Sequence, residues 1–289
     1  MHMSTSNAEV IWTGVYRYLR FIYKVLLNLK YVTNNKKLIR EESDAVLILG
    51  NGPSLNCIDI DRIIKKGVQV ICVNFFPCRD GRFFSIKPRY LCLIDPVFFS
   101  ASDDDNFSKK KKDLISTLEI VDWQIDIIVY WGKRLPLKNA CINYIDLSTI
   151  VYRSRIFRCY IYERNIATMG FHNVIACALF FTLITNAKEV YLAGVDNTEF
   201  LNYEVDKDND VYLVAKHSYG TMKAKCYDIQ KGEFYKRLAC YCQMFEEYHY
   251  LSQYAKNIVG ARITNLNPYS FVDVFDKSLD YYTKLETNA

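Results

Sequence analysis

The sequence predicts an α/β fold in which helices flank a mostly parallel sheet. Short apolar runs alternate with helix-like segments along most of the chain, the pattern of repeated βαβ units. The run at 46–49 ends in Gly50-Asn51-Gly52-Pro53-Ser54-Leu55, where the backbone must turn sharply. A later run at 189–193 ends in Gly194-Val195-Asp196. Two apolar strands that end in glycine and polar residues indicate an open sheet with a ligand crevice at its edge.

Composition limits the classes of protein that fit. The 289 residues, 51% of them apolar, are enough for one large domain, alone or with appendages. A net charge of +5 is too small for a dedicated nucleic-acid binder, but it suits an anionic ligand or an acidic membrane surface. No Cys-x-x-Cys pair occurs among the ten cysteines, and no signal peptide of the usual form is present. We therefore expect reduced thiols and a cytoplasmic location.

The expected domain order starts with an N-terminal region, residues 1–45. Its segment 10–29 reads as an amphipathic helix with apolar residues on one face and Arg17, Arg20 and Lys24 on the other. Three cations count against a membrane span, whereas this pattern suits a helix lying on an anionic lipid surface. The alternative is docking on the main domain or on a second copy of the chain, as in a homo-oligomer. The apolar face consists of Ile11, Val15, Tyr18, Ile22, Leu26 and Leu29.

The main domain is expected to span 46–272, followed by a tail at 273–289. Each predicted strand is a short apolar run bounded by turn residues. Segment 170–185 is apolar all round and reads as a buried helix, whereas 102–113 is polar and reads as an exposed loop that runs into a helix. The other expected helices are 59–66 and 234–256. The expected strands are 46–49, 68–74, 90–94, 125–130, 142–147, 189–193 and 262–266.

Polar residues follow four of these strands. They are the Gly50–Gly52 turn, Asn74, Asp95 and the Gly194–Asp196 turn. Because ligands of open α/β sheets bind beyond the carboxyl ends of the strands, we expect all four to border one crevice. Glycines at 50 and 52 would allow positive φ and the close approach of a phosphate, with Pro53 at a first helical position and the next amides as donors. The alternative is a plain Gly-Pro turn after a buried strand.

Residues 197–233 read as a lid, because the sequence after Asp196 stays polar and irregular to about Gly220. His217 lies in it and is the expected general base, since an imidazole titrates near neutral pH. Its alternative is an ordinary surface histidine. His172, at the start of the apolar helix, is expected to be a packed or capping residue, and His249 lies in a Tyr-rich helix.

No metal site and no cofactor are expected. Enzymes that bind a diphosphate through Mg²⁺ or Mn²⁺ can hold the metal with an Asp-x-Asp at a strand end. The two matches here, Asp59-Ile60-Asp61 and Asp206-Lys207-Asp208, lie at a helix start and in a charged loop.

Several segments occur in the order found in one enzyme family, over roughly residues 46–272. The chain resembles the bacterial sialyltransferases of glycosyltransferase family 42. The resemblance implies a Rossmann-like GT-A variant fold and metal-independent, inverting transfer from a CMP-sialic acid donor to a lipooligosaccharide acceptor at the inner membrane. The matching segments are 49–55, 73–76, 95–99, 164–170, 189–196 and 267–270.

The resemblance also implies roles for particular residues. Asn51 and Asn74 would hold the nucleotide and its phosphate, Gly194 and Asp196 would meet the ribose or base, and His217 would be the lid base. Arg164, before the central helix, and Tyr203, in the lid, would act in catalysis. The remaining residues expected to bind the donor are Gly50, Gly52, Ser54, Asp95, Thr168 and Ser270.

Two departures from the family leave the donor open. Thr198 replaces one of the two tyrosines that bind the departing phosphate, and Tyr203 is displaced by one position. Asp95 stands where the family has asparagine. Kdo or another relative of sialic acid is therefore an alternative sugar.

A second resemblance, to MptE-like proteins, rests on the Gly-x-Gly-Pro-Ser-Leu turn, Asp95-Pro96 and the later Gly-x-Asp. It implies a metal-dependent nucleotide-sugar or pterin-type transferase. A nucleotide-binding scaffold without activity is the third alternative.

Overall fold

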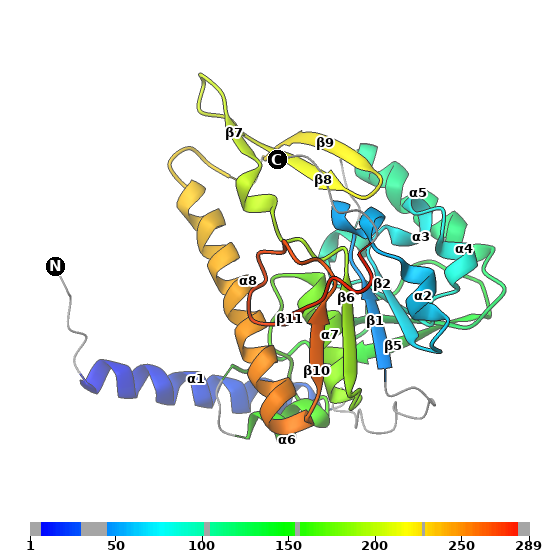
Figure 1. Ribbon diagram of the computed structural model, residues 1–289. Helices are drawn as coiled ribbons and strands as arrows, with labels where there is room; N and C mark the ends of the chain where they lie inside the picture. Colours follow the sequence, from blue (N-terminus) through cyan, green and yellow to red (C-terminus); the bar gives the residue numbers. More distant parts are fainter. Residues whose placement is uncertain (1–6, 30–44, 101–104, 154–156, 227–228, 283–289) are drawn as a thin grey trace.

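The computed structural model describes residues 7–29, 45–100, 105–153, 157–226 and 229–282. Its centre is an eight-stranded sheet of order β11-β10-β6-β1-β2-β3-β4-β5, in which all neighbouring strands are parallel (Figure 1). The α/β, Rossmann-like class predicted from the sequence is confirmed. Since β1 lies between β2 and β6, the chain reverses its direction across the sheet there, at the kind of switch point where open sheets bind ligands. The strands are β1 (Ala45–Leu49), β2 (Gln69–Val73), β3 (Tyr90–Cys92), β4 (Ile125–Tyr130), β5 (Ile142–Leu147), β6 (Glu189–Ala193), β10 (Arg262–Asn265) and β11 (Asp276–Lys277).

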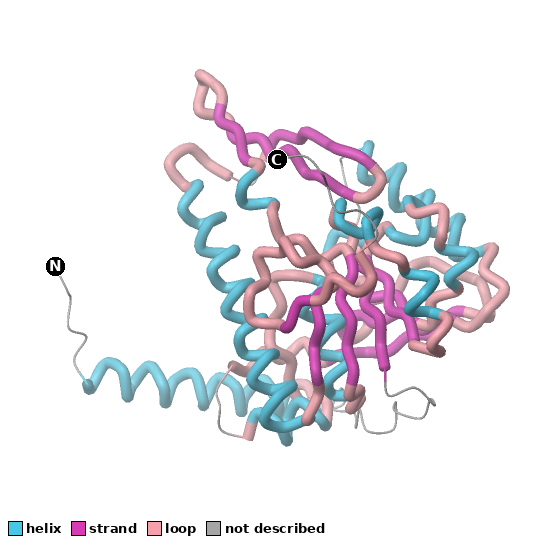
Figure 2. Tube along the Cα trace, in the orientation of Figure 1, coloured by secondary structure: helices cyan, strands magenta, loops and turns pink. Residues whose placement is uncertain are grey.

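Helices cover both faces of this sheet (Figures 1 and 2). Alternate residues of β1 enter two separate cores, with Val46 and Ile48 in one and Leu47 and Leu49 in the other. The first core contains α6 (Arg158–Glu163), α7 (Val174–Ile184) and α8 (Phe234–Tyr254), and the second contains α2 (Ile60–Ile64), α3 (Phe76–Arg79), α4 (Phe83–Ile86) and α5 (Asp105–Glu119).

The predicted elements form close to their expected bounds. All seven expected strands are present, and α7 is buried along almost its whole length, as its apolar sequence predicts. The helix expected after the polar segment 102–113 is present as α5, but it begins at Asp105, so most of the expected loop is helical; residues 101–104 lie outside the described part. The short β11 was not predicted. It pairs with β10 through only two residues, and it lies in the segment expected to be a tail.

The lid is a small antiparallel sheet, not the irregular segment that its polarity suggested. It consists of β7 (Tyr203–Val205), β8 (Val211–His217) and β9 (Gly220–Lys225). The lid sequence is polar although it forms strands, because these strands cover the edge of the domain and expose much of their surface. The turn after β8 is docked on the first strand-end loop: the Ser218 amide donates to the Asn51 carbonyl at 2.9 Å, and Asn56 Nδ2 donates to the Ser218 carbonyl at 2.7 Å.

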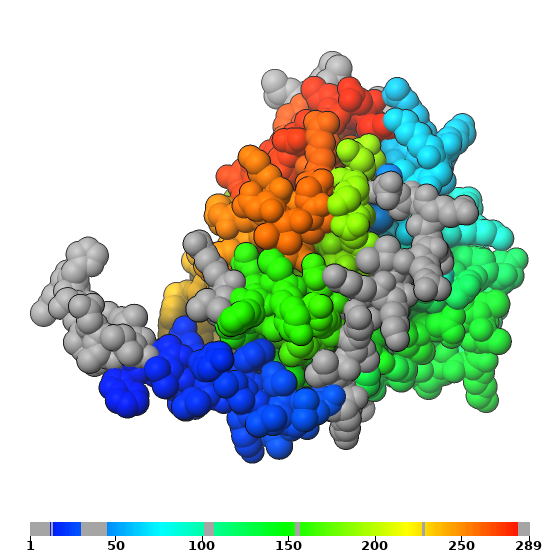
Figure 3. Space-filling model, turned by 90° about the horizontal axis from the view of Figure 1, so that it is seen from below, coloured from blue at the N-terminus to red at the C-terminus, as the bar shows by residue number. Residues whose placement is uncertain are grey.

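The N-terminal helix α1 (Asn7–Leu27) extends away from the body (Figures 1 and 3). Its second half is docked, because the Phe21 ring packs on Tyr152 with 4.2 Å between centroids and Val25 packs against the first core. Much of its apolar surface stays exposed, including Trp12, with 72% of its surface accessible. No helix in the described part of the chain has the length and apolar character needed to cross a membrane. The polar sequence at 33–44 predicts a linker between this helix and the main domain, and these residues lie outside that part.

Candidate functional site

A cavity of about 670 Å³ lies at the carboxyl ends of β1, β2, β3 and β6. The lid closes part of it, since residues at the end of β8 form one wall. We call it the strand-end cavity. All four strand ends that the sequence predicted to border one crevice contribute to it. The expected site residues in its lining are Asn51, Gly52, Asn74, Asp95, Gly194, Asp196 and His217.

The glycines of the first turn serve a purpose that the sequence analysis did not predict. The Gly50 amide donates to the Ala193 carbonyl at 2.7 Å, and the Gly52 amide donates to the Gly194 carbonyl at 2.9 Å. A Cβ added at Gly50 would lie 2.4 Å from the Gly194 oxygen. Neither Gly50 nor Gly52 has a positive φ; Gly194 does, at +67°. The expectation of positive φ at 50 and 52 was therefore wrong, and these glycines permit contact between two strand-end loops.

Asp196 occupies the place where a ligand phosphate was expected. Its carboxylate accepts the Ser54 amide at Oδ2, at 3.1 Å, and the Asn267 side-chain amide at Oδ1. Ser54 belongs to the short helix η3 (Pro53–Cys57), which has Pro53 at its first position, as predicted. Burial raises the pKa of Asp196, and the bonds from Ser54 and Asn267 oppose that rise. The start of η3 is thus already used within the protein and is not free for a phosphate.

Two amide oxygens in the cavity wall have no partner among the described residues. Asn51 Nδ2 donates to the Val73 carbonyl at 3.3 Å, which turns Oδ1 the other way. Both Asn51 Oδ1 and Asn74 Oδ1 are buried and unpaired. Asn74 also has φ of +52°, a conformation that asparagine tolerates better than most residues. Because a buried, unpaired acceptor costs free energy, these oxygens are suited to accept N–H or O–H groups of a ligand.

His217 forms the lid side of the cavity. Its ring stacks on Tyr219, with 4.9 Å between centroids and planes 16° apart. Burial lowers the pKa of His217, and the charge of Lys110 acts in the same direction, while Glu199 and a hydrogen bond with the Asn51 main chain oppose them. A lowered pKa keeps the imidazole neutral at pH 7, which is the form that can accept a proton.

Tyr203 reaches the cavity only through another tyrosine. Its hydroxyl lies 2.9 Å from that of Tyr241, and Tyr241 donates to Glu199 Oε2 at 3.3 Å. Tyr241 and Glu199 line the cavity together with Thr198. Burial raises the pKa of both tyrosines, so both keep their hydroxyl protons at neutral pH. Sequence reasoning missed Tyr241, because nothing distinguishes it from the other tyrosines of its helix.

Other expected site residues lie outside the cavity lining. The Arg164 guanidinium packs 3.8 Å from the Tyr160 ring centroid and lies 3.8 Å from a Glu163 oxygen, on the surface of α6. Thr168 is fully buried and pairs with the main chain of Ile150, its amide donating at 2.7 Å.

Ser270 and Asp95 stabilise the loops around the cavity. Ser270 Oγ donates to the Val195 carbonyl at 2.7 Å, which holds the Gly194–Asp196 turn in place. Asp95 lies exposed at the rim, and its Oδ1 accepts the Val97 amide at 3.1 Å.

The start of α7 also faces the cavity, and it brings in a histidine that the sequence analysis set aside. The interpretation of His172 as a packed or capping residue was wrong: it lines the cavity, and the helix cap is Asn173, whose Oδ1 accepts the Ile175 amide at 2.6 Å. The positive end of a helix dipole favours an anion. The start of α7 is therefore a favourable place for an anionic group, whereas the start of η3 is already occupied by the Asp196 carboxylate.

Glu247 on α8 lies behind this wall, with only 2% of its surface exposed. Burial raises its pKa to about 7, against the opposing effects of the His172 amide and the Arg153 charge. The folded protein therefore binds a proton here that the unfolded chain has lost above pH 4.5. We expect the free energy of unfolding to fall by on the order of 2 kcal/mol as pH rises from 4.5 to 7. Denaturant titrations should show this fall in the wild type and in the control Glu246→Gln, but not in Glu247→Gln; an equal fall in all three would contradict it.

The two Asp-x-Asp sequences have local structural roles. Asp59 caps α2 by accepting the Arg62 amide at 3.0 Å, and Asp206 accepts the amides of Asp208 and Asp210 within one turn. Over the described ranges, no three His, Cys, Asp or Glu side chains are grouped so that they could hold a metal ion.

No protein-family model and no curated protein matches the chain. Two similar solved structures are both of glycosyltransferases. One is the MAf glycosyltransferase from Magnetospirillum magneticum AMB-1, with a TM-score of 0.46 and 10% identity over 86% of this chain. The match spans only 35% of the length of that protein. The other is the sialyltransferase CstII from Campylobacter jejuni, solved in complex with a substrate analogue, cytidine-5'-monophosphate; its TM-score is 0.41 and its identity 15%, over 85% of this chain and 89% of that one.

Proposed function

We propose that the chain is an inverting glycosyltransferase that moves a sialic acid or a related ulosonic acid from a CMP-sugar to a hydroxyl of a bacterial surface glycan. One observation carries the proposal: the strand-end cavity joins unpaired amide oxygens at the ends of β1 and β2 to a neutral histidine on a lid. The first feature suits a nucleoside, and the second suits activation of an acceptor hydroxyl.

The donor would lie across the sheet edge. The free oxygens of Asn51 and Asn74 would accept hydrogen bonds from the cytosine amino group or the ribose hydroxyls. The phosphate would lie at the start of α7, where the helix dipole favours an anion and Lys216 adds a positive charge to the lining. This differs from the arrangement expected from the sequence, because Asp196 holds the Ser54 amide.

The reaction would use groups already in the cavity wall. His217 takes the proton of the acceptor hydroxyl while the hydroxyl oxygen forms a bond to the anomeric carbon. The bond from that carbon to the phosphate oxygen breaks on the opposite side, and CMP leaves with the electron pair. The neutral Tyr241 hydroxyl, which donates to Glu199 without a ligand, would turn to donate to the leaving phosphate and stabilise its developing charge, and Tyr203 behind it would hydrogen-bond to Tyr241.

A panel of CMP-sugars, with hydrolysis and transfer both measured, tests the proposal. We expect turnover of at least one CMP-ulosonic acid that persists in excess EDTA. Loss of turnover in EDTA would favour the metal-dependent transferase. Tight CMP binding with no turnover of any donor would favour the scaffold without activity.

We further propose that α1 holds the enzyme on an anionic inner-membrane surface. Trp12, Leu19 and Tyr23 are each at least 59% exposed, and Arg17 and Arg20 are exposed on the same helix. Apolar and aromatic side chains beside cations are what an interfacial helix uses to bind acidic lipid.

A charge inserted into the exposed surface of α1 tests this contact. We expect Leu19→Glu combined with Tyr23→Glu to weaken co-sedimentation with phosphatidylglycerol vesicles by at least tenfold, since it removes apolar contact and adds repulsion. The control Ile120→Glu changes an equally exposed apolar residue elsewhere, 69% exposed, and should bind as the wild type does. Unchanged vesicle binding in the double variant, together with loss of a dimer in ultracentrifugation, would assign the surface to a second copy of the chain.

A further inference from the structure

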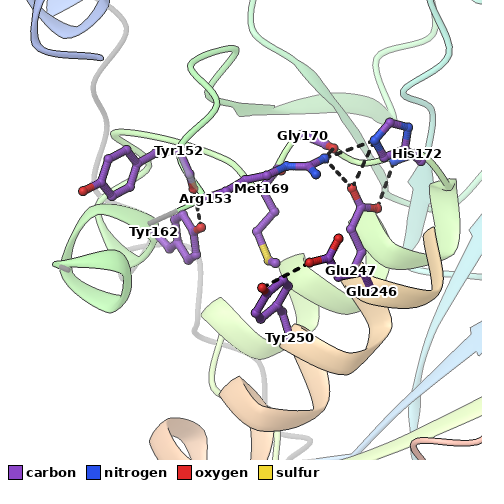
Figure 4. A network of polar contacts seen from close by, with 9 residues as sticks. All are labelled: Tyr152, Arg153, Tyr162, Met169, Gly170, His172, Glu246, Glu247 and Tyr250. Carbon is purple, nitrogen blue, oxygen red and sulfur yellow. Dashed lines mark hydrogen bonds and ion pairs between the residues drawn. The ribbon is translucent and has the colours of Figure 1, made fainter. Parts of the chain in front are cut away.

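Behind the cavity, one arginine joins the loop before α7 to helix α8 (Figure 4). Arg153 Nε donates to the Met169 carbonyl at 3.0 Å, and Nη2 donates to the Gly170 carbonyl at 2.8 Å. The same Nη2 lies 2.9 Å from Glu247 Oε1 and 3.1 Å from His172 Nε2. None of these contacts involves a residue with a role in the proposed reaction, yet His172 forms part of the cavity wall.

The Arg153 contact determines which nitrogen of His172 carries the hydrogen. The two hydrogens of Nη2 serve three acceptors, so His172 Nε2 shares one of them with the Gly170 carbonyl or Glu247 Oε1. A guanidinium has no acceptor atom, so a hydrogen on Nε2 would find none at Arg153, and the nearest carboxylate oxygen, Glu247 Oε1, lies 3.8 Å away. The lone pair of Nε2 therefore faces Arg153. The hydrogen of the neutral ring is then on Nδ1. A proton added at Nε2 would point at another N–H group beside a positive charge. Burial and the Arg153 charge both lower the pKa of His172, which agrees with this geometry.

Glu247 fixes the main chain of His172 from the other side. Its Oε2 accepts the His172 amide at 3.0 Å, while Oε1 holds Arg153. The carboxylate therefore positions the main chain of His172 and the guanidinium of Arg153, and the contact from Arg153 Nη2 to Nε2 is the one that holds the ring. In the described part of the chain, His172 Nδ1 has no hydrogen-bond partner, and the next residue, Asn173, is the N-cap of α7. Two phenols, Tyr130 and Tyr241, also line this side of the cavity; burial raises the pKa of both, so they remain neutral. The Glu199 carboxylate, which accepts a hydrogen bond from Tyr241, lines the cavity as well.

We propose that Arg153 and Glu247 hold His172 as a neutral imidazole whose Nδ1–H donates a hydrogen bond to an anionic oxygen of the substrate in the strand-end cavity. The identity of that substrate rests on the proposed function; the state of the ring does not. His172 is then a substrate-binding donor, not a second base, and its proton does not move during the reaction. Arg153 and Glu247 are positioning residues.

Nuclear magnetic resonance of the full chain labelled with ¹⁵N-histidine tests the state of the ring. The chain has only four histidines, so each signal can be assigned by a single His→Gln variant. We expect His172 to show a protonated Nδ1 and an unprotonated Nε2 at pH 7, and to titrate below pH 6.5, the ordinary value. Arg153→Met should move its titration upward and mix the two neutral forms. A protonated Nε2 in the wild type, or no change in Arg153→Met, would overturn the proposal.

Ligand titrations test the hydrogen bond. We expect CMP, but not cytidine, to shift the Nδ1–H signal if the anion is a phosphate, and free N-acetylneuraminic acid to shift it if the anion is a carboxylate. If neither CMP nor N-acetylneuraminic acid shifts the signal, although calorimetry shows that CMP is bound, the donor role of His172 is overturned.

A pair of variants separates binding from structural support. His172→Leu should weaken CMP binding about tenfold, whereas His172→Gln, which keeps an N–H donor, should stay within threefold. Equal losses in both variants would indicate a purely structural role. If no nucleotide binds to the wild-type chain, the proposed function fails while the ring measurement still reports on Arg153 and His172.

Discussion

Replacing His217 with alanine is expected to lower kcat by about 10²- to 10⁴-fold, with little change in KM for the donor. The acceptor hydroxyl would lose the group that takes its proton, while the nucleotide contacts at the ends of β1 and β2 would remain. Steady-state transfer from the active CMP-sugar measures the effect. The control is His249→Ala, because His249 is exposed on α8 and hydrogen-bonded to Gln253, away from the cavity.

The pH dependence of kcat/KM tests the role of His217 in a second way. Because burial lowers the pKa of His217 below its ordinary 6.5, the base is deprotonated at pH 7, and kcat/KM should fall only as the pH drops below that value. His217→Ala should lack this fall. Full activity in His217→Ala together with its loss in His172→Ala would move the role of base to the other wall of the cavity.

The second large effect concerns Gly50. Gly50→Ala should destabilise the protein by about 3 kcal/mol and abolish CMP binding, because its Cβ would lie 2.4 Å from the Gly194 oxygen and neither main chain can move without opening the sheet edge. Denaturant unfolding and calorimetry with CMP measure the two effects. Gly81→Ala is the matched control, since an added Cβ there meets no atom within 4 Å and Gly81 has no positive φ. Its stability should stay within about 0.5 kcal/mol of the wild type.

A Gly50→Ala protein as stable as the Gly81→Ala control would mean that the two strand-end loops do not touch as described. A stable Gly50→Ala protein that had lost only CMP binding would instead support the original interpretation of this turn, in which glycine is required by the ligand.

The strands and their polar ends were predictable, because the sequence of a buried parallel strand is a continuous apolar run and turn residues follow it. Asn51, Asn74, Asp95 and Asp196 each follow such a run, and the parallel arrangement alone brings them to one edge. His217 was predictable as a lid residue because it lies in a long connection after the central strand. The place of His217 in the cavity wall depends on β8, a strand that could not be predicted from its polar sequence.

What the sequence could not predict depends on contacts between distant segments. His172 and Tyr241 reach the cavity from α7 and α8, and no local pattern distinguishes them from packed residues. The carboxylate of Asp196 binds the Ser54 amide across 142 positions of sequence, which removes that amide from the expected phosphate site. The proximity of Gly50 to Gly194 has the same origin, since a steric requirement of this kind arises only when β1 and β6 pair.

The proposed function and the role of His172 both require that the strand-end cavity binds the nucleotide. A crystal structure of the protein soaked with CMP tests it most directly. We expect cytidine within hydrogen-bond distance of Asn51 Oδ1 or Asn74 Oδ1, the unpaired amide oxygens of the cavity wall, and the phosphate at the start of α7. CMP bound at any other surface, with both oxygens still unpaired, would contradict it.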